Sequence, residues 1–462
     1  MTFHSAPTLD AERVCMNLGV ATHSTQPGTY LFLTPGGTYG TGVGIFKDNG
    51  TLVWWHHTGD PKVHDASVVT YLGRPYLAVF SGHPAAAGPY DNGTVTLYNQ
   101  HYQKAGRITS GRPFGPGHVD LHEFRITPQG RALIGITNPV RRVINGHPVT
   151  VIEYVVQELS LVRDAHGIHT GRVLFQWKSL PQVPVSETYA PDPGAGRIWD
   201  YFHGNSIAQD TDGNLIISAR GTWGIYKVSI KTGRIMWQVG GRGDHTLRHP
   251  WCFQHDAVPL GGNEYTVFDD SSVGSPCQSG GRTHPARGII VRVDPSRHPA
   301  TVRLVRAYIH RPSIHPVVAG SMQLLADGDA LIDWGYQPEV TEFGANGQVN
   351  MDLSLSRWSY RGLRFAWDGQ PLTPPAISAQ FTSTTTRLWA SWNGSTEVAA
   401  WRVLAGPNGS ALKPVGNAVP KRSFETSILL QRRYATVEVQ ALDAHGRVLA
   451  TSRPASAASD QP

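Results

Sequence analysis

Three polar residues of types suited to anion chemistry lie close together in the stretch FHGNSIAQDTDGNLIISAR, residues 202–220. The polar turn TDGN separates two short apolar runs in this stretch, and such a pattern predicts a β-hairpin. His203 and Asn205 begin the first predicted strand and share one of its faces, because they are two residues apart. Arg220 ends the return strand and is therefore expected beside His203. A guanidinium fork with an imidazole and an amide suits a tetrahedral oxyanion such as sulfate or phosphate.

The same arrangement of a polar head, a short strand, a turn with glycine and a second strand recurs along the chain. The residues at the heads are His64, His122, His203, His255 and Ser321. Further strand pairs lie between these hairpins, for example GIYKVSIKTGRIMWQVGG at 224–241. One hairpin and one further pair make four strands, which is the size of one blade of a β-propeller. The innermost strands of a propeller line its channel, so we expect the histidine heads to meet near one mouth of the channel.

These repeats predict an all-β protein, and 50 Gly and 33 Pro residues agree with many short strands joined by turns. The number of heads favours a six-bladed β-propeller over residues 28–370, although five or seven blades remain open. Residues 1–27 are expected to form an N-terminal extension. Residues 376–455 alternate like a small C-terminal β-sandwich of the fibronectin or immunoglobulin kind, and we expect support rather than chemistry from it. Residues 456–462 are expected to be a disordered tail.

Charge and hydropathy limit the partners and the compartment. The 40 basic and 34 acidic residues give a formal net charge of +6, but the basic residues are scattered, so no nucleic-acid partner is indicated. No apolar run approaches the roughly 18 residues of a transmembrane segment. The N-terminal sequence MTFHSAPTLDAERVCMNLGV shows no signal peptide, which leaves either a cytoplasmic protein or a processed or misassigned start.

The three cysteines are too few for a disulfide scaffold. Cys252 and Cys277 flank one predicted strand pair and either form one bridge or remain two thiols. Cys15 is left unpaired in both cases.

The recurring histidines allow three interpretations. A single histidine at the start of a strand is usually a structural hydrogen bonder, whereas recurrence at equivalent heads favours a functional cluster. Three histidines could also bind zinc, copper or iron. Their ligands would come from different blades without a close pair, and Arg220 would oppose a cation, so no metal is expected. A non-catalytic propeller that binds ligands or partners is the third interpretation.

At this point several segments together resemble the bacterial arylsulfotransferases that use no nucleotide sulfate donor. They are DYFHGNSIAQDTDGNLIISARGTWGIYKVSIKTGRIMWQVGG (200–241), DLHEFRITPQGRALI (120–134), FQHDAVPLGGNEYTVFDD (253–270), GSMQLLADGDALIDWGYQPEVTEF (320–343) and SYRGLRFAWDGQPLTPP (359–375). The resemblance implies a six-bladed propeller that moves a sulfuryl group from a phenolic sulfate ester to another phenol, with no cofactor. It also implies a secreted or cell-envelope protein, although the usual secretion signal is missing. Gly204 stands where the family usually has an apolar residue, and Asp270 where it commonly has Asn.

Matching the motifs residue by residue carries the family's site onto this chain. The transiently sulfated nucleophile corresponds to His255. The sulfate-binding set corresponds to His203, Asn205 and Arg220, and a further channel histidine to His122.

These residues fit the implied chemistry. A neutral imidazole is a competent nucleophile near pH 7, and a sulfated imidazole is a good leaving group, which predicts ping-pong kinetics. We expect His203, Asn205 and Arg220 to hold the sulfuryl oxygens and His122 to shuttle the phenol proton. Either Asp256 or a backbone carbonyl is expected to fix the tautomer of His255.

Overall fold

The computed structural model describes residues 1–16, 26–36, 42–58, 62–84, 91–242, 251–271 and 285–457. These residues form strands, turns and loops, with a short 3-10 helix at Val185–Glu187 and no α-helix in the ranges given. The protein is therefore all-β, as the repeating hairpins predict. Throughout these ranges, no helix is long and apolar enough to cross a membrane.

Three of the sheets contain four antiparallel strands each. They are β27 (Gly362–Ala366), β2 (Thr29–Leu33), β3 (Gly42–Phe46) and β4 (Leu52–His57); β15 (Gly204–Gln209), β16 (Leu215–Ala219), β17 (Gly224–Val228) and β18 (Ile235–Val239); and β19 (His255–Gly261), β20 (Glu264–Asp269), β21 (Arg287–Asp294) and β22 (Thr301–Tyr308). A five-stranded sheet has the order β1 (Val14–Met16), β26 (Val349–Leu355), β25 (Glu339–Phe343), β24 (Ala330–Asp333) and β23 (Ser321–Leu324). Every hairpin predicted from the sequence is present among these strands or in the sheet that follows.

A ten-stranded sheet joins two further runs of four strands. The first run is β5 (Lys62–Tyr71), β6 (Arg74–Pro84), β7 (Asp91–Tyr98) and β8 (Lys104–Ile108), and the second is β10 (Phe124–Ile126), β11 (Arg131–Ile144), β12 (His147–Asp164) and β13 (Gly167–Lys178). A short parallel contact between β8 and β13 connects the two runs. The two remaining strands are β9 (Val119–Asp120), which pairs with β7, and β14 (Ile198–Trp199), which pairs with β12.

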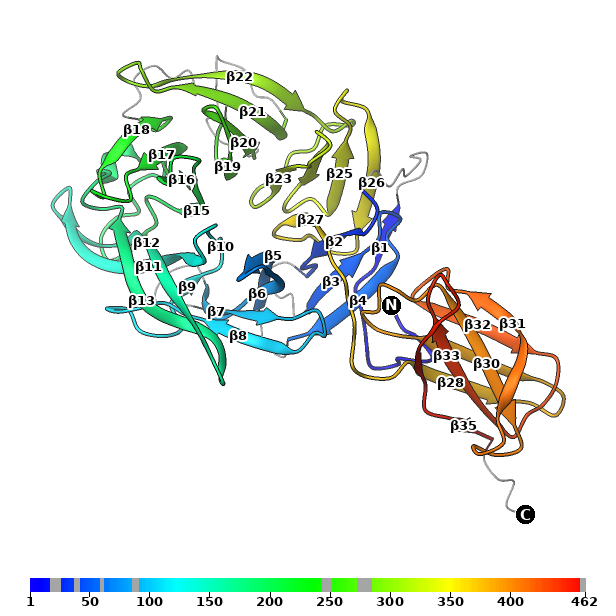
Figure 1. Cartoon of the computed structure of the whole chain (residues 1–462). Helices are drawn as coiled ribbons and strands as arrows, with labels where there is room; N and C mark the ends of the chain where they lie inside the picture. The colour runs from blue at the N-terminus through cyan, green and yellow to red at the C-terminus, as the bar shows by residue number, and fades with distance from the viewer. Residues whose placement is uncertain are drawn as a thin grey trace.

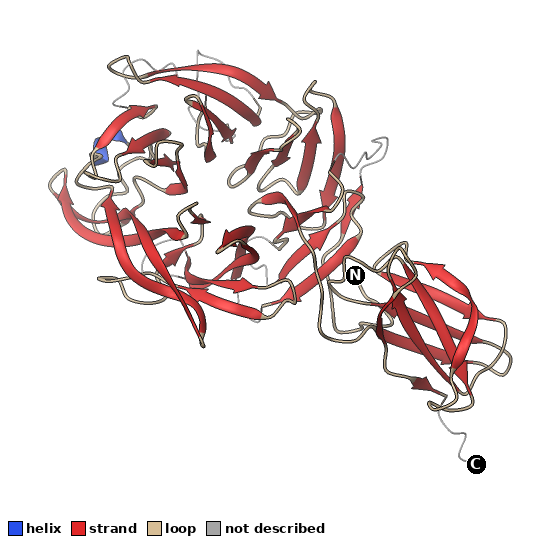
Figure 2. Ribbon diagram, viewed as in Figure 1, coloured by secondary structure: helices blue, strands red, loops and turns tan. Residues whose placement is uncertain are grey.

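The sheets stand around a central opening, with β5, β10, β15, β19, β23 and β27 closest to it (Figures 1 and 2). Pairing between distant parts of the chain closes the arrangement, because β27 pairs with β2 and β1 pairs with β26. The strand β1 therefore lies in a sheet, although it falls within the expected N-terminal extension. The turns that return the inner strands contain glycines at positive φ, for example Gly213 at +84° and Gly328 at +90°, which glycine adopts without steric cost.

Two further sheets follow β27 and pack against each other (Figure 1). One is β28 (Ala376–Phe381), β29 (Thr386–Ser391) and β32 (Glu425–Leu430); the other is β31 (Lys413–Pro420), β30 (Ala400–Gly406), β33 (Thr436–Leu442) and β34 (Val448–Thr451), with β35 (Ala455–Ser456) paired to β33. Leu388, Trp401, Ile428 and Val439 come from both sheets and share one apolar core. Residues 458–462, within the expected tail, lie outside the described residues.

Contacts between the C-terminal sheets and the ring of sheets include the loop at Asn393 and the N-terminal segment. The Asn393 side chain pairs with the backbone of Trp55, accepting from its N–H at 3.0 Å and donating to its carbonyl at 2.9 Å. The N-terminal segment makes another contact, since Ser5 donates to the Glu425 carboxylate and Phe3 packs on Phe424.

The cysteines fall into two groups. Cys252 is disulfide-bonded, and Cys15 is free and exposed. Cys277, the partner considered for Cys252 from the sequence, lies outside the described residues.

Candidate functional site

The inner strands that carry the head residues begin with irregular backbone. The strand register shifts between Val63 and Ala66 in β5, between Gly204 and Ser206 in β15, and between His255 and Val258 in β19. Such bulges are frequent beside active sites because they re-aim side chains at the end of a strand. His203 and Asp256 also have positive φ values, +52° and +53°, which are uncommon for residues with a side chain. The backbone is thus shaped locally to present the head residues.

The structure brings four of the expected site residues together. The rings of His122 and His203 lie edge to face with centroids 5.2 Å apart. Burial is the largest cause that lowers the pKa of His255. The positive charges of Arg220, His203 and His122 also lower this pKa, which indicates that all three side chains lie near the His255 ring. The side chains come from separate strands or strand ends, as expected for residues that meet at the channel.

His122 and His203 are each oriented by a carboxylate a few residues earlier in the chain. His122 Nδ1 lies 2.7 Å from Asp120 Oδ2, and this oxygen also accepts the backbone N–H of His122 at 3.2 Å. His203 Nδ1 lies 2.8 Å from Asp200 Oδ2. When Nδ1 donates to a carboxylate, the opposite nitrogen, Nε2, is the one left to meet a substrate. Neither carboxylate was predicted from the sequence, although they stand two and three residues before the histidines.

His255 has a different environment. Its side chain is 2% exposed, and its Nδ1 has no hydrogen-bond partner among the described residues. Burial is the largest cause that lowers the pKa of His255 well below its ordinary value, so the ring is neutral at pH 7. The neighbouring Asp256 carboxylate turns away and accepts the Met322 N–H at 3.2 Å. The expectation that Asp256 or a backbone carbonyl fixes the tautomer of His255 is therefore wrong for the part of the chain that is described.

Asn205 connects the two strands that carry the histidines. Its side chain is fully buried, and Nδ2 donates to the carbonyl of Gln254, the residue before His255, at 2.7 Å. The Gln254 amide in turn donates to Ser218 Oγ and to the carbonyls of Ala219 and Gly224. Asn205 thus fixes the backbone that presents His255, while its own Oδ1 has no partner within the described ranges.

Arg220 is held over the site by backbone and ring contacts. Its N–H donates to the His203 carbonyl at 2.9 Å, its Nη2 donates to the Val317 carbonyl at 3.1 Å, and its guanidinium lies 4.8 Å from the centre of the Phe253 ring. Its Nε is buried without a partner in the described part of the chain, so the guanidinium retains hydrogen-bonding capacity for an anion.

Asp270 is a buried acid close to Arg220. Burial raises the pKa of Asp270 well above its ordinary value, with Arg220 opposing this effect, and both carboxyl oxygens lack a partner among the described residues. Burial therefore favours the protonated form of Asp270, which is close in shape and polarity to Asn, the residue that the resembled family commonly carries here.

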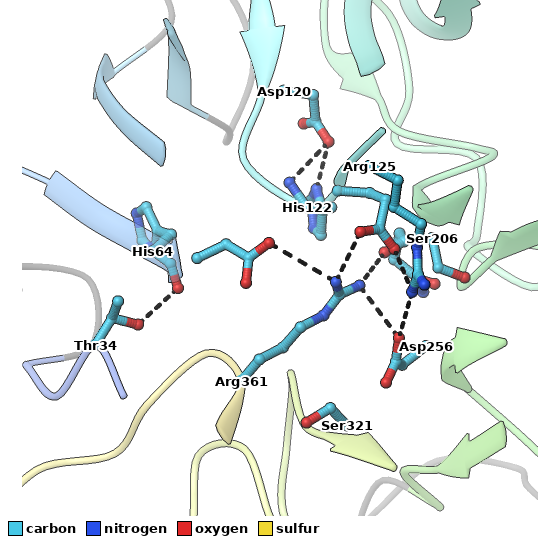
Figure 3. Close-up of polar contacts among 12 residues, drawn as sticks. Thr34, His64, Asp120, His122, Arg125, Ser206, Asp256, Ser321 and Arg361 are labelled. Carbon is cyan, nitrogen blue, oxygen red and sulfur yellow. Dashed lines mark hydrogen bonds and ion pairs between the residues drawn. The ribbon is translucent and has the colours of Figure 1, made fainter. Parts of the chain in front are cut away.

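A buried ion cluster, which was not predicted from the sequence, lies next to the histidines. Its centre is Arg361, which is 3% exposed and directly precedes β27 (Figure 3). Three buried carboxylates face this guanidinium: Glu123 at 3.2 Å, Asp256 at 3.7 Å and Asp65 at 3.8 Å. Arg361 also donates to the Asn205 carbonyl at 3.0 Å, and so supports the same backbone that Asn205 fixes. A clue was present, because each acid directly follows a histidine head.

The other two heads lie outside the histidine group. The His64 carbonyl accepts from Thr34 Oγ1 at 2.7 Å (Figure 3). The His64 ring centre is 6.3 Å from that of Phe80. Ser321 is fully buried in β23. Across the described ranges, no group of three or more His, Cys, Asp or Glu side chains is placed to hold a metal ion.

Comparisons with solved structures give remote similarities. A protein of unknown function from Bacteroides caccae is 13% identical with a TM-score of 0.44, covering 73% of this chain and 99% of that one. A catalytically inactive virginiamycin B lyase from Staphylococcus aureus, solved with quinupristin, is 10% identical with a TM-score of 0.36, covering 81% and 95%. A protein of unknown function from Dyadobacter fermentans is 10% identical with a TM-score of 0.36, covering 88% and 100%.

No curated protein matches the sequence significantly. The family comparison is informative, because the profile of the family described as Arylsulfotransferase (ASST) matches residues 67–356, more than half of the chain. The matched segment contains all five site residues expected from the sequence. The chain therefore belongs to the arylsulfotransferase (ASST) family.

Proposed function

We propose that this protein transfers a sulfuryl group from a phenolic sulfate ester to another phenol through a sulfated His255. The observation that carries the proposal is the environment of His255. It is a buried imidazole held neutral by burial and by the neighbouring positive charges, within a group that contains Arg220, His122 and His203. A neutral imidazole has the lone pair that nucleophilic attack on sulfur requires.

In the first half-reaction, the His255 lone pair forms the nitrogen–sulfur bond and the sulfur–oxygen bond of the donor breaks. The electron pair of the broken bond goes to the leaving phenol oxygen, which takes the Nε2 proton of a His122 imidazolium and leaves His122 neutral, with its Nδ1–H still donated to Asp120. In the second half-reaction, the acceptor phenol returns a proton to His122, attacks sulfur and restores the lone pair of His255. His122 suits this role because its contact with Asp120 directs Nε2 away from the carboxylate.

Arg220 and His203 are proposed to bind the non-bridging sulfuryl oxygens. The Arg220 Nε has no partner among the described residues. The Nδ1 of His203 donates to Asp200, so its Nε2 donates to a sulfuryl oxygen when the ring is protonated. Burial lowers the pKa of His203, and the negative charges of Asp200 and of the bound sulfate group oppose this effect. Such preorganised donors stabilise the charge that moves between donor and acceptor oxygens. Asn205 contributes through position, since one of its amide hydrogens goes to the Gln254 carbonyl.

The same proposal includes the finer architecture. The four-stranded groups headed by β5, β10, β15, β19, β23 and β27 are proposed to be the blades of a six-bladed propeller over about residues 28–370. The paired sheets from β28 to β35 are proposed to be a small sandwich domain over about residues 376–455.

Rapid mixing with 4-nitrophenyl sulfate tests the mechanism. Without an acceptor, the protein should release one equivalent of 4-nitrophenol in a burst, and with varied donor and acceptor it should give the parallel double-reciprocal lines of ping-pong kinetics. Intersecting lines and no burst would instead indicate direct transfer in a ternary complex. A complete lack of turnover with aryl sulfates would favour a non-catalytic binding protein.

A further inference from the structure

A cavity of about 720 Å³ lies on the other side of the Arg361 cluster from the histidines. It extends along the inner strands β5, β10, β19, β23 and β27 as far as the turns at Leu72–Gly73 and Gln129–Gly130. The histidine heads stand at the opposite ends of these strands. None of the four site residues grouped around His255 is among the described residues that line this cavity. The cavity is thus a compartment separate from the proposed sulfuryl-transfer site.

The closed end of the cavity is polar and the walls are largely apolar. The charged residues that line the cavity are Glu123, Arg125, Asp256 and Arg361. Arg125 reaches furthest toward solvent, with 33% of its side chain exposed, against 3% for the side chains of Glu123 and Asp256. Along the walls, Val258, Leu363 and Phe365 are half-buried apolar side chains. A ligand that fills this space needs an apolar body and a polar end.

The hydrogen bonding at the closed end is incomplete. The Nε atoms of Arg125 and Arg361 are buried and have no partner among the described residues. The contacts of Asp256 with Arg125 and Arg361, at 3.5 and 3.7 Å, are longer than well-formed charge-assisted hydrogen bonds. Buried polar groups left in this state cost free energy. A ligand group that both donates and accepts would relieve this cost.

The charge of the cluster selects among ligands. Two guanidinium groups face three carboxylates, which gives a formal charge of −1 if all are ionised. Burial, the largest cause, raises the pKa of Asp65 to about 7 and also raises that of Asp256, so partial proton uptake, mainly by Asp65, moves the charge of the cluster from −1 toward zero at pH 7. A charged ligand would disturb this balance in a buried place, where unpaired charge is costly. A neutral hydroxyl group would not.

We propose that this second cavity binds a neutral aromatic alcohol, in the first instance a phenol, through its hydroxyl group. The hydroxyl donates to the Asp256 carboxylate and accepts from Arg125, and the ring lies among the apolar walls. The site is distinct from the one at which sulfuryl transfer is proposed and does not depend on it.

Isothermal titration with 2-naphthol tests the proposal on the full chain without a sulfate donor. Val258→Trp fills the cavity wall, and Leu260→Trp narrows it near the turns. Val143→Trp, at a 72% exposed position outside the cavity, is the matched control. We expect Val258→Trp and Leu260→Trp to weaken one class of 2-naphthol sites at least tenfold while the control binds like the wild type. Aryl sulfate turnover should change by less than about twofold in all three variants, because none touches the histidine group.

Matched probes decide the ligand class. Naphthalene-2-carboxylate and 2-naphthylmethylammonium carry the same ring with a negative or positive charge, and both should bind the Val258-dependent site more weakly than 2-naphthol. Unchanged 2-naphthol binding in the tryptophan variants would overturn the proposal, as would equal or tighter binding of either charged probe at that site. If Val258→Trp does not fold, 2-naphthol binding to Leu260→Trp alone decides the proposal. These outcomes are independent of whether the protein transfers sulfate.

Discussion

Buried ionisable groups are distributed very differently between the ring of sheets and the C-terminal pair of sheets. The inner ends of the ring strands bury His122, His255, Glu123, Asp256 and Arg361, each at most 5% exposed. The core shared by the C-terminal sheets is apolar, and most of the polar side chains buried there are hydroxyls such as those of Thr386 and Ser391. Burying charge costs several kcal/mol unless it is paired. The ring also buries pairs such as Lys227–Asp210 and Arg364–Glu342. The group at the inner strand ends differs because it lies beside the proposed site, where function is expected to offset that cost.

Paired substitutions in the two regions should separate chemistry from stability. His255→Ala removes the proposed nucleophile, so transfer should fall by roughly 10³-fold or more while thermal unfolding is little changed. Leu388→Ala removes a fully buried side chain from the C-terminal core, and should cost about 2–5 kcal/mol of unfolding free energy there with little effect on transfer. Initial rates and calorimetry measure both quantities. Wild-type transfer rates in His255→Ala would show that the buried histidine group is not needed for transfer.

The buried cluster should make the ring sensitive to pH in a way that the C-terminal core is not. The Asp65 pKa is raised from 3.8 to about 7 in the folded protein. The folded state therefore binds the proton more tightly, and stability is lost as the pH rises from about 4 to about 7. This difference corresponds at most to roughly 4 kcal/mol. Asp65→Asn should remove this loss, so its stability relative to the wild type should rise between pH 4 and pH 8 in urea titrations. A constant difference between the two proteins would contradict the burial argument.

The carboxylate behind His122 should matter for rate more than for stability. Asp120→Asn keeps the size of the side chain but no longer holds the imidazole through an anionic acceptor, so kcat should fall about 10–100-fold. Asp200→Asn should have a smaller effect, because His203 is proposed to bind rather than to transfer protons. The kcat–pH profile should shift in Asp120→Asn and stay unchanged in Asp200→Asn. This result would show that Asp120 orients His122 as the proton carrier, rather than that its loss causes a packing defect. Equal effects on both profiles would contradict the assigned roles.

The smallest effect is expected at Asp270. Since burial raises the pKa of this acid and so favours its protonated form, Asp270→Asn should change transfer at pH 7 by less than about threefold. Asp270→Ala, which removes the polar group near Arg220, serves as the contrast and should be the more impaired of the two. A large loss in Asp270→Asn would show that the ionised acid is needed.

The sequence predicted those features that repeat in it. A polar head before each hairpin is visible because the pattern returns in every unit, and His122, His203 and His255 could therefore be grouped without coordinates. The ion cluster could not be assembled in this way. Its centre, Arg361, directly precedes the strand that closes the ring, so its nearness to Asp65 and Asp256 depends on a closure that spans most of the chain. The bulges that turn Asp256 away from His255 are also set by tertiary packing, which explains why the expected contact between them is absent.

The most direct test of the account is mass spectrometry of protein mixed with an aryl sulfate alone and quenched under alkaline conditions, where a nitrogen-bound sulfuryl group is preserved. One added sulfuryl group is expected on the peptide that contains His255, and it should be lost again when a phenol is added before quenching. The label should be absent from His255→Ala. A stable label on another residue, or turnover with no labelled peptide, would contradict the assignment of His255 as the nucleophile.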